Sequence, residues 1–280
     1  MILSFGSNPA NAGGAALALG LPSLMALVGY LVSAIIGRRP VANVQRTALL
    51  VGWVCHGLAL VSDTTGLGSD VSGARFGFAL ALSATAWLVM AVYGIESRFL
   101  PMLTVHRPLT VFCIVAVAVA WAFPAEIRSA SLSPWAPLHW VLGIASYGLF
   151  GAAVLHAAML NRVERQLRGK GLAPRETAPG IPLLRLESLT FRFVAAGFAV
   201  LSAALLLGAW FANPWRWDHK TVFSILGWFV FAALLAGRHV FGWRGLHATR
   251  WLYAGAALLL LAYVGSRFVL EVLLHRLPGS

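Results

Sequence analysis

The chain has 280 residues, of which 59% are hydrophobic and only 11% are charged, with a formal net charge of +12. Because about a quarter of an average globular chain is charged, this composition excludes an ordinary water-soluble domain and indicates an integral membrane protein. The positive charge is spread between apolar runs rather than gathered in one patch, which argues against nucleic-acid binding.

Eight apolar runs follow one another along the chain. Most of them reach or approach the ~20 residues that a helix needs to cross a ~30 Å hydrocarbon core. We therefore predict an all-α fold, a polytopic membrane bundle of about eight transmembrane helices, in a single integral membrane domain covering residues 1–280. The predicted spans cover residues 15–37, 48–66, 76–96, 108–123, 139–160, 190–211, 221–237 and 251–272.

Basic residues gather in alternate loops between these spans. Most of the 21 lysines and arginines lie in the loops after the first, third, fifth and seventh runs. Because basic loops stay cytoplasmic, we predict a multi-pass protein of the bacterial inner membrane with both termini on the outer side. The longest of these loops, residues 161–189, is expected to begin as a continuation of the fifth helix and to form a partly ordered connector.

Four of the eight histidines lie at matching predicted depths. His139 opens the fifth span and His275 follows the eighth, so both are expected at the outer face. His56 lies inside the second span and His239 closes the seventh, on the inner side. Ionisable residues at such positions are costly, so each is a functional hypothesis.

Two histidines at one depth match what bis-histidine ligation of a haem iron requires, because the flat macrocycle takes one imidazole on each face. Interfacial placement, helix–helix hydrogen bonding and proton relay explain single histidines equally well. His106 and His247 are expected to be solvated in basic loops, and His156 to serve either the inner site or helix packing.

The segment NPWRWDHKTVFSILGW, residues 213–228, concentrates rings and charges in one place. Trp215 and Trp217 suit an interfacial aromatic belt. Belt tryptophans do not require the neighbouring Asp218, however. Flat rings that cover one face of a porphyrin explain the segment too, with Arg216 and Lys220 pairing with its carboxylates.

This segment resembles the tryptophan-rich (WWD-type), CcsA-like haem-handling membrane proteins of cytochrome c assembly. The family places a W-x-W-D-x-K-E segment before a span that ends in an inner histidine, followed by a span that ends in an outer histidine. In this chain Thr221 stands where the family has the glutamate. Here ILGWFVFAALLAGRH ends in His239 and RFVLEVLLHR contains His275, while LHWVLGIASYGLFGAA resembles the span led by His139. His219 stands where the family has proline. The likeness covers roughly residues 135–280 and points to the short HemX-type and YpjD-type branch.

The resemblance implies haem b, one or two molecules, as the cofactor. His56 and His239 would ligate the iron at an inner site, and His139 and His275 at an outer site under the tryptophan segment. The protein would move or present haem, with apocytochrome c or another assembly membrane protein as partner. A proton-coupled small-molecule transporter and a fixed di-haem electron-transfer protein are the alternatives. The sequence carries no nucleophile–base pair, P-loop or dinucleotide fingerprint, so classical catalysis is not expected.

Overall fold

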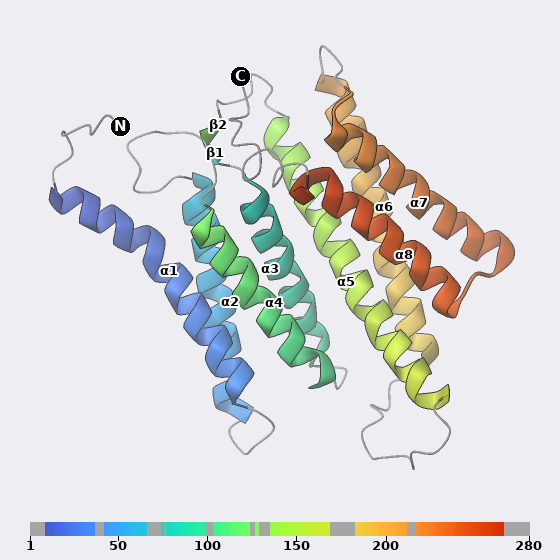
Figure 1. Ribbon diagram of the computed structural model, residues 1–280, viewed down its shortest axis with the longest axis horizontal. Helices are drawn as coiled ribbons and strands as arrows, with labels where there is room; N and C mark the ends of the chain where they lie inside the picture. Colours follow the sequence, from blue (N-terminus) through green and yellow to red (C-terminus); the bar gives the residue numbers. More distant parts are fainter. Residues whose placement is uncertain are drawn as a thin grey trace. The chain divides into compact units, whose positions relative to one another are not determined.

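A computed structural model describes residues 9–36, 42–65, 74–75, 77–98, 103–123, 127–128, 135–168, 183–211 and 217–265. Within these ranges the protein is helical apart from one pair of two-residue strands (Figure 1). The prediction of an all-α polytopic bundle is confirmed. The elements are α1 (Pro9–Ile35), α2 (Ala42–Thr65), β1 (Ala74–Arg75), α3 (Phe78–Glu96), α4 (Leu103–Ala122), β2 (Ile127–Arg128), α5 (Ala136–Arg168), α6 (Leu183–Phe211), α7 (His219–Phe241) and α8 (Gly245–Leu260), which continues as a π-helical turn over Leu261–Gly265.

Six of the described helices are long and apolar enough to cross a membrane, namely α2 through α7. The described part of α1 adds a shorter apolar helix, Gly20–Ile35. Lipid offers no hydrogen-bond partners to a polypeptide backbone, so a chain crosses it as helices that satisfy their own backbone groups. The protein is therefore a multi-pass membrane protein.

Several helices extend beyond the apolar runs that predicted them, whereas α3 lies within its run. α2, α6 and α8 each begin several residues before their run, and α5 continues to Arg168, well past residue 160. Hydropathy marks only the part of a helix that lies in hydrocarbon, whereas lysine and arginine are good helix formers and prolong it into the headgroup region. The predicted continuation of the fifth helix into the 161–189 loop is confirmed.

The chain divides into two compact units, and the boundaries fall within α3 and near the start of α4. Unit 1 comprises residues 1–87 and 106–131, and unit 2 comprises residues 88–105 and 132–280. The single-domain organisation stays a prediction.

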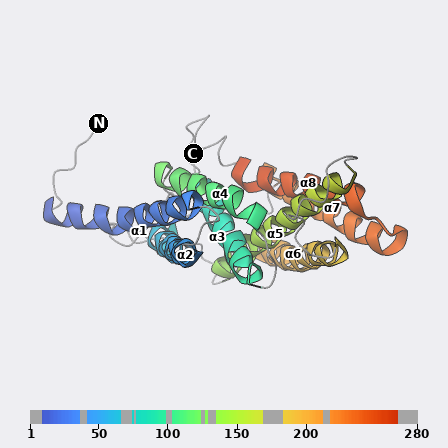
Figure 2. The ribbon, with the colours of Figure 1, turned by 90° about the horizontal axis from the view of Figure 1, so that it is seen from below.

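Unit 1 is built around the pair α1 and α2, which run side by side (Figures 1 and 2). Their backbones meet at two glycines, since a Cβ added to Gly29 would lie 2.7 Å from the Cα of Gly52. Trp53 of α2 and Trp87 of α3 stack with ring centroids 4.8 Å apart, and each indole N–H donates to the other's backbone carbonyl. The glycine contact and the stacked tryptophans thus allow these helices to pack closely in lipid, where the hydrophobic effect does not drive helix association.

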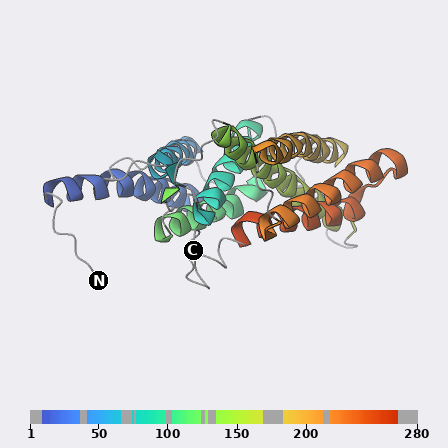
Figure 3. The same ribbon diagram turned by 90° about the horizontal axis from the view of Figure 1, so that it is seen from above.

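Unit 2 contains the pair α5 and α6 together with the hairpin of α7 and α8 (Figure 3). The hairpin turns at Gly242, whose left-handed φ of 65° closes α7 with its N–H bonded to the carbonyls of Gly237 and Arg238. Phe150 of α5 and Phe231 of α7 stack within the apolar core, with their ring centroids 3.8 Å apart. This core packs α5, α6, α7 and α8 against one another, and α5 and α7 carry the described site residues of unit 2.

Candidate functional site

His139 lies in the first turns of α5, against the last turns of α6. Its Nδ1 is 2.9 Å from the carbonyl oxygen of Ala204. A Cβ added at Gly208 would meet its Cε1 at 2.9 Å, so the ring occupies space that only a glycine leaves open. Because a carbonyl only accepts, Nδ1 carries the proton and Nε2 carries the lone pair.

Part of the tryptophan segment lies at the same end of unit 2. Lys220, in the first turn of α7, interacts electrostatically with His139. Trp217, just before α7, exposes 72% of its surface. The structure thus places a predicted iron ligand within electrostatic range of a lysine that is predicted to pair with the haem carboxylates. Trp215, Arg216 and His275 lie outside the described residues.

Asp218 has a local structural role. It is the N-cap of α7, and its Oδ1 accepts hydrogen bonds from the Thr221 backbone N–H at 2.8 Å and from the Thr221 hydroxyl at 2.7 Å. Such a cap satisfies a backbone donor that the helix leaves without an internal partner. His219 follows as the first, exposed residue of α7. A role of Asp218 in cofactor binding stays a prediction.

His56 lies in unit 1 and is almost completely buried, with 1% of its surface exposed. The Tyr30 hydroxyl is 3.1 Å from its Nδ1, and the Ser83 hydroxyl is 2.8 Å from its Nε2. Both ring nitrogens are therefore engaged by side chains of α1 and α3. Iron ligation by His56 requires one of these hydrogen bonds to be given up.

His239 lies in unit 2, in the last turn of α7, with an exposed side chain. The preceding residue, Arg238, is anchored to α6, where it pairs with Glu187 at 3.0 Å and lies 3.6 Å above the ring of Phe191. His56 and His239 belong to different units, and their pairing stays a prediction.

The expectation that His106 is solvated is wrong. His106 lies inside α4 with 7% of its surface exposed, and its Nε2 is 3.1 Å from the Ser33 carbonyl and 3.2 Å from the Ser33 hydroxyl. The helix begins at Leu103, before the apolar run, and carries His106 into unit 1. His106, Thr110 and Cys113 are all buried, and their spacing puts them on one face of a helix. This spacing is the sequence signal that His106 faces the interior.

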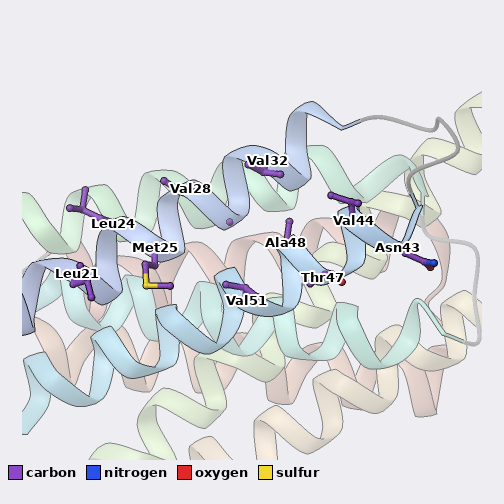
Figure 4. Close-up of a pocket in the computed structure, with 11 residues that line it drawn as sticks. Leu21, Leu24, Met25, Val28, Val32, Asn43, Val44, Thr47, Ala48 and Val51 are labelled. Carbon is purple, nitrogen blue, oxygen red and sulfur yellow. The ribbon is translucent and has the colours of Figure 1, made fainter.

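An apolar groove lies between α1 and α2, and Figure 4 shows its side chains. It encloses about 600 Å³. No histidine, cysteine or charged residue lines it, and its apolar lining suits the acyl chains that surround a membrane protein. The lining residues are Leu21, Leu24, Met25, Val28, Gly29, Val32, Asn43, Val44, Thr47, Ala48 and Val51.

Over residues 18–274 the chain matches the family described as cytochrome C assembly protein. The chain belongs to this family. Because the matched residues include most of both units, the family relationship covers the protein as a whole, and the resemblance inferred from the tryptophan segment is confirmed.

Several relatives show how this family member compares with others. It is 30% identical over 268 residues to the inner membrane protein YpjD of Escherichia coli K12, an alignment that covers 90% of this chain and 98% of the relative. It is 25% identical over 253 residues to the cytochrome c biogenesis protein CcsA of Synechococcus sp. (strain JA-3-3Ab), covering 69% of this chain and 72% of the relative. CcsA of Gloeobacter violaceus is 31% identical over 91 residues, covering 31% of this chain and 27% of the relative. No solved structure matches the chain.

A metal site of the usual protein-ligand kind is not present among the described side chains of this cytochrome c assembly family member. They form no group of three or more histidine, cysteine, aspartate or glutamate residues that could hold a metal ion.

Proposed function

We propose that this family member binds haem b at the end of unit 2 where α5 and α7 begin, and holds it there for transfer to an acceptor. The observation that carries the proposal is the environment of His139. A histidine that ligates a metal typically donates its other ring N–H to a carbonyl or carboxylate, which fixes the tautomer and the orientation of the ring. The 2.9 Å contact between Nδ1 and the Ala204 carbonyl meets that condition and directs the lone pair to Nε2.

The macrocycle requires ligands for its iron and cations for its propionate groups, and the chain would supply both. His139 and His275 would ligate the iron, and Arg216 and Lys220 would pair with the propionate carboxylates. Trp215 and Trp217 would cover one face of the ring and exclude water from it. Bound haem supplies one-electron redox chemistry at its iron. Trp217, which exposes 72% of its surface just before α7, suits such a lid.

The full proposal includes an inner site. The chain would hold haem between His56 and His239 and then between His139 and His275, with both termini on the outer side of the inner membrane. Apocytochrome c or another membrane protein of the assembly pathway would be the acceptor. Ligation of iron through the His56 Nε2 would require this nitrogen to give up its 2.8 Å hydrogen bond with the Ser83 hydroxyl. Replacing Ser83 with alanine frees that nitrogen without removing the imidazole.

The test is the absorption spectrum of the detergent-purified protein, with a pyridine haemochrome assay for stoichiometry. We expect the wild type to carry haem with the low-spin spectrum of bis-histidine ligation. His139→Gly should lose that spectrum and regain it when imidazole is added, because free imidazole fills the space of the missing ring. His247→Gln is the matched control, since His247 is exposed and lies against Trp243 instead of in the proposed site.

Protein without haem, even when it is expressed with excess haem precursor, would overturn the proposal. An inner site predicts that Ser83→Ala gains haem, whereas a purely structural His56 predicts an unchanged haem content. Transfer is separated from permanent binding by mixing the haem-loaded protein with an apo-acceptor. Movement of haem to the acceptor supports a handling role, and retention favours fixed electron transfer.

A further inference from the structure

Unit 2 contains a buried acid–base pair that the haem proposal does not use. Glu96 is the last residue of α3, and His156 lies in the middle of α5. The His156 Nε2 and the Glu96 Oε2 are 2.8 Å apart. The His156 side chain is fully buried and its ring stacks on Phe193 of α6, with centroids 5.2 Å apart, while 15% of the Glu96 side chain is exposed. The pair thus reaches from the end of α3 into the helix interface.

The hydrogen-bond partners of His156 determine how many protons the pair holds. Its Nδ1 is 2.7 Å from the carbonyl oxygen of Ala152, which only accepts, so Nδ1 must carry a hydrogen. The Nε2 then faces a carboxylate oxygen. If neither atom carried a proton, two lone pairs would meet at 2.8 Å inside a medium of low dielectric constant, which is strongly unfavourable. The contact therefore requires one proton between Nε2 and Oε2.

No other group among the described residues serves these two atoms. Both are buried, and each has the other as its only polar partner there. Glu164, two turns after His156 on α5, is half-buried, and its Oε2 has no hydrogen-bond partner among the described residues. Other ionisable side chains on the neighbouring elements are engaged elsewhere, buried or exposed. Glu187 of α6 pairs with Arg238 of α7, Tyr253 of α8 accepts from Asn161, Arg165 of α5 donates to the Asn161 carbonyl, Tyr93 is a buried phenol one turn before Glu96, and Arg98 and Arg192 are exposed.

The partners differ in their access to water. Glu96 ends α3 and is followed by the exposed residues Ser97 and Arg98, whereas His156 is enclosed by α5 and α6. A proton can therefore reach the carboxyl group from the aqueous face at which α3 ends, which the charge pattern predicts to be cytoplasmic. From there it passes to the imidazole over a single hydrogen bond.

We propose that Glu96 and His156 form a proton-binding site in unit 2. The site holds one proton, shared between Oε2 and Nε2, and exchanges it with water through Glu96. On release, the proton leaves to water and the pair becomes a carboxylate facing a neutral imidazole, which weakens the contact between α3 and α5. The occupancy of the site thus links proton concentration to the packing of these two helices, with or without haem.

Nitrogen NMR of the full-length protein, labelled with ¹⁵N-histidine and reconstituted in lipid nanodiscs, tests this site. In the wild type we expect the His156 Nε2 signal to report a shared proton at neutral pH and to move toward the neutral-ring position as the pH rises. Glu96→Gln should abolish that movement, because the amide N–H donates to Nε2 and keeps the ring neutral at every pH. His156→Gln identifies the signal by removing it.

Glu164→Gln is the matched control, since it is the same acid-to-amide change on another partly buried glutamate of unit 2 and should leave the His156 signal unchanged. A His156 signal that stays constant from about pH 5 to 10, the range around the usual histidine titration, would overturn the proposal in favour of a fixed ion pair. So would a signal that Glu96→Gln leaves as it is in the wild type. The wild-type titration decides the matter even if a variant fails to fold.

Discussion

At the scale of single residues, the tryptophan segment combines two kinds of role. Asp218 completes the N-terminus of α7 through Thr221, which explains an aspartate at this position without any ligand. Lys220, two residues later, interacts with His139 of α5. The helix that Asp218 initiates therefore fixes where Lys220 stands.

Asp218→Ala should destabilise the protein by about 1 kcal/mol, because the N-cap hydrogen bond to Thr221 is lost. Asp218→Asn should retain the stability, since its side-chain oxygen still accepts from the Thr221 N–H. Thermal unfolding in detergent measures the first effect, and the haem content per folded protein is measured in parallel. If Asp218→Asn keeps its stability but loses haem, Asp218 contacts the cofactor and the capping explanation is insufficient.

At the scale of elements, glycine decides how closely helices approach. The contact of Gly29 with Gly52 brings the backbones of α1 and α2 together, and the atoms around a new Cβ are backbone atoms that cannot rotate away. Between membrane helices, such close packing provides the attraction that water-driven burial supplies in soluble proteins. The α1–α2 pair therefore depends on these two positions more than on any single large side chain.

Gly29→Ala should destabilise unit 1 by about 1–3 kcal/mol, the usual cost of overpacking, despite the higher helix propensity of alanine. Gly20→Ala in the same helix is the control, because nothing lies within 4 Å of a Cβ there. It should leave the stability unchanged or raise it slightly. Thermal unfolding of both variants in the same detergent checks the difference. Equal stability of the two variants would show that the helix contact at Gly29 is not close in the folded protein.

At the scale of the whole molecule, charge and hydropathy govern the crossing of the membrane. Six described helices are long and apolar enough to span it, and most of the basic residues lie in alternate loops. Because cytoplasmic loops retain lysine and arginine, this pattern supports an even number of crossings with both termini outside. The 161–189 loop, which follows the long α5, would then be cytoplasmic.

A reporter fused to the C-terminus tests this orientation. Alkaline phosphatase fused after Ser280 should be active, because that enzyme requires the oxidising outer compartment. The same enzyme fused after Lys170, within the basic loop, should be inactive. Measuring both activities in whole cells, normalised to the amount of fusion protein, checks the prediction. The reverse pattern would place the termini in the cytoplasm and exchange the predicted inner and outer histidine pairs.

The sequence by itself determined the class of the protein, the helical elements and the family. Apolar runs of sufficient length allow only helices in lipid, and the segment from Trp215 to Lys220 carries the family likeness, so both are local properties that a linear pattern contains. Loop charge and matching depth also led to His139, and the tryptophan segment led to Lys220, whose charge acts on His139 in the structure. The helix ends were less accurate, because hydropathy marks the hydrocarbon layer and not the end of the helix.

Only the tertiary structure decided what the histidines contact. His56 is engaged by Tyr30 and Ser83, and His106 by Ser33, although their sequence surroundings had suggested a ligand and a solvated loop residue. The pairing of His156 with Glu96, 60 positions earlier in the chain, followed from no local pattern. Hydrogen-bond partners of a buried side chain come from other helices. Their identity depends on how the helices rotate and slide against one another, and neither hydropathy nor spacing within one helix specifies that.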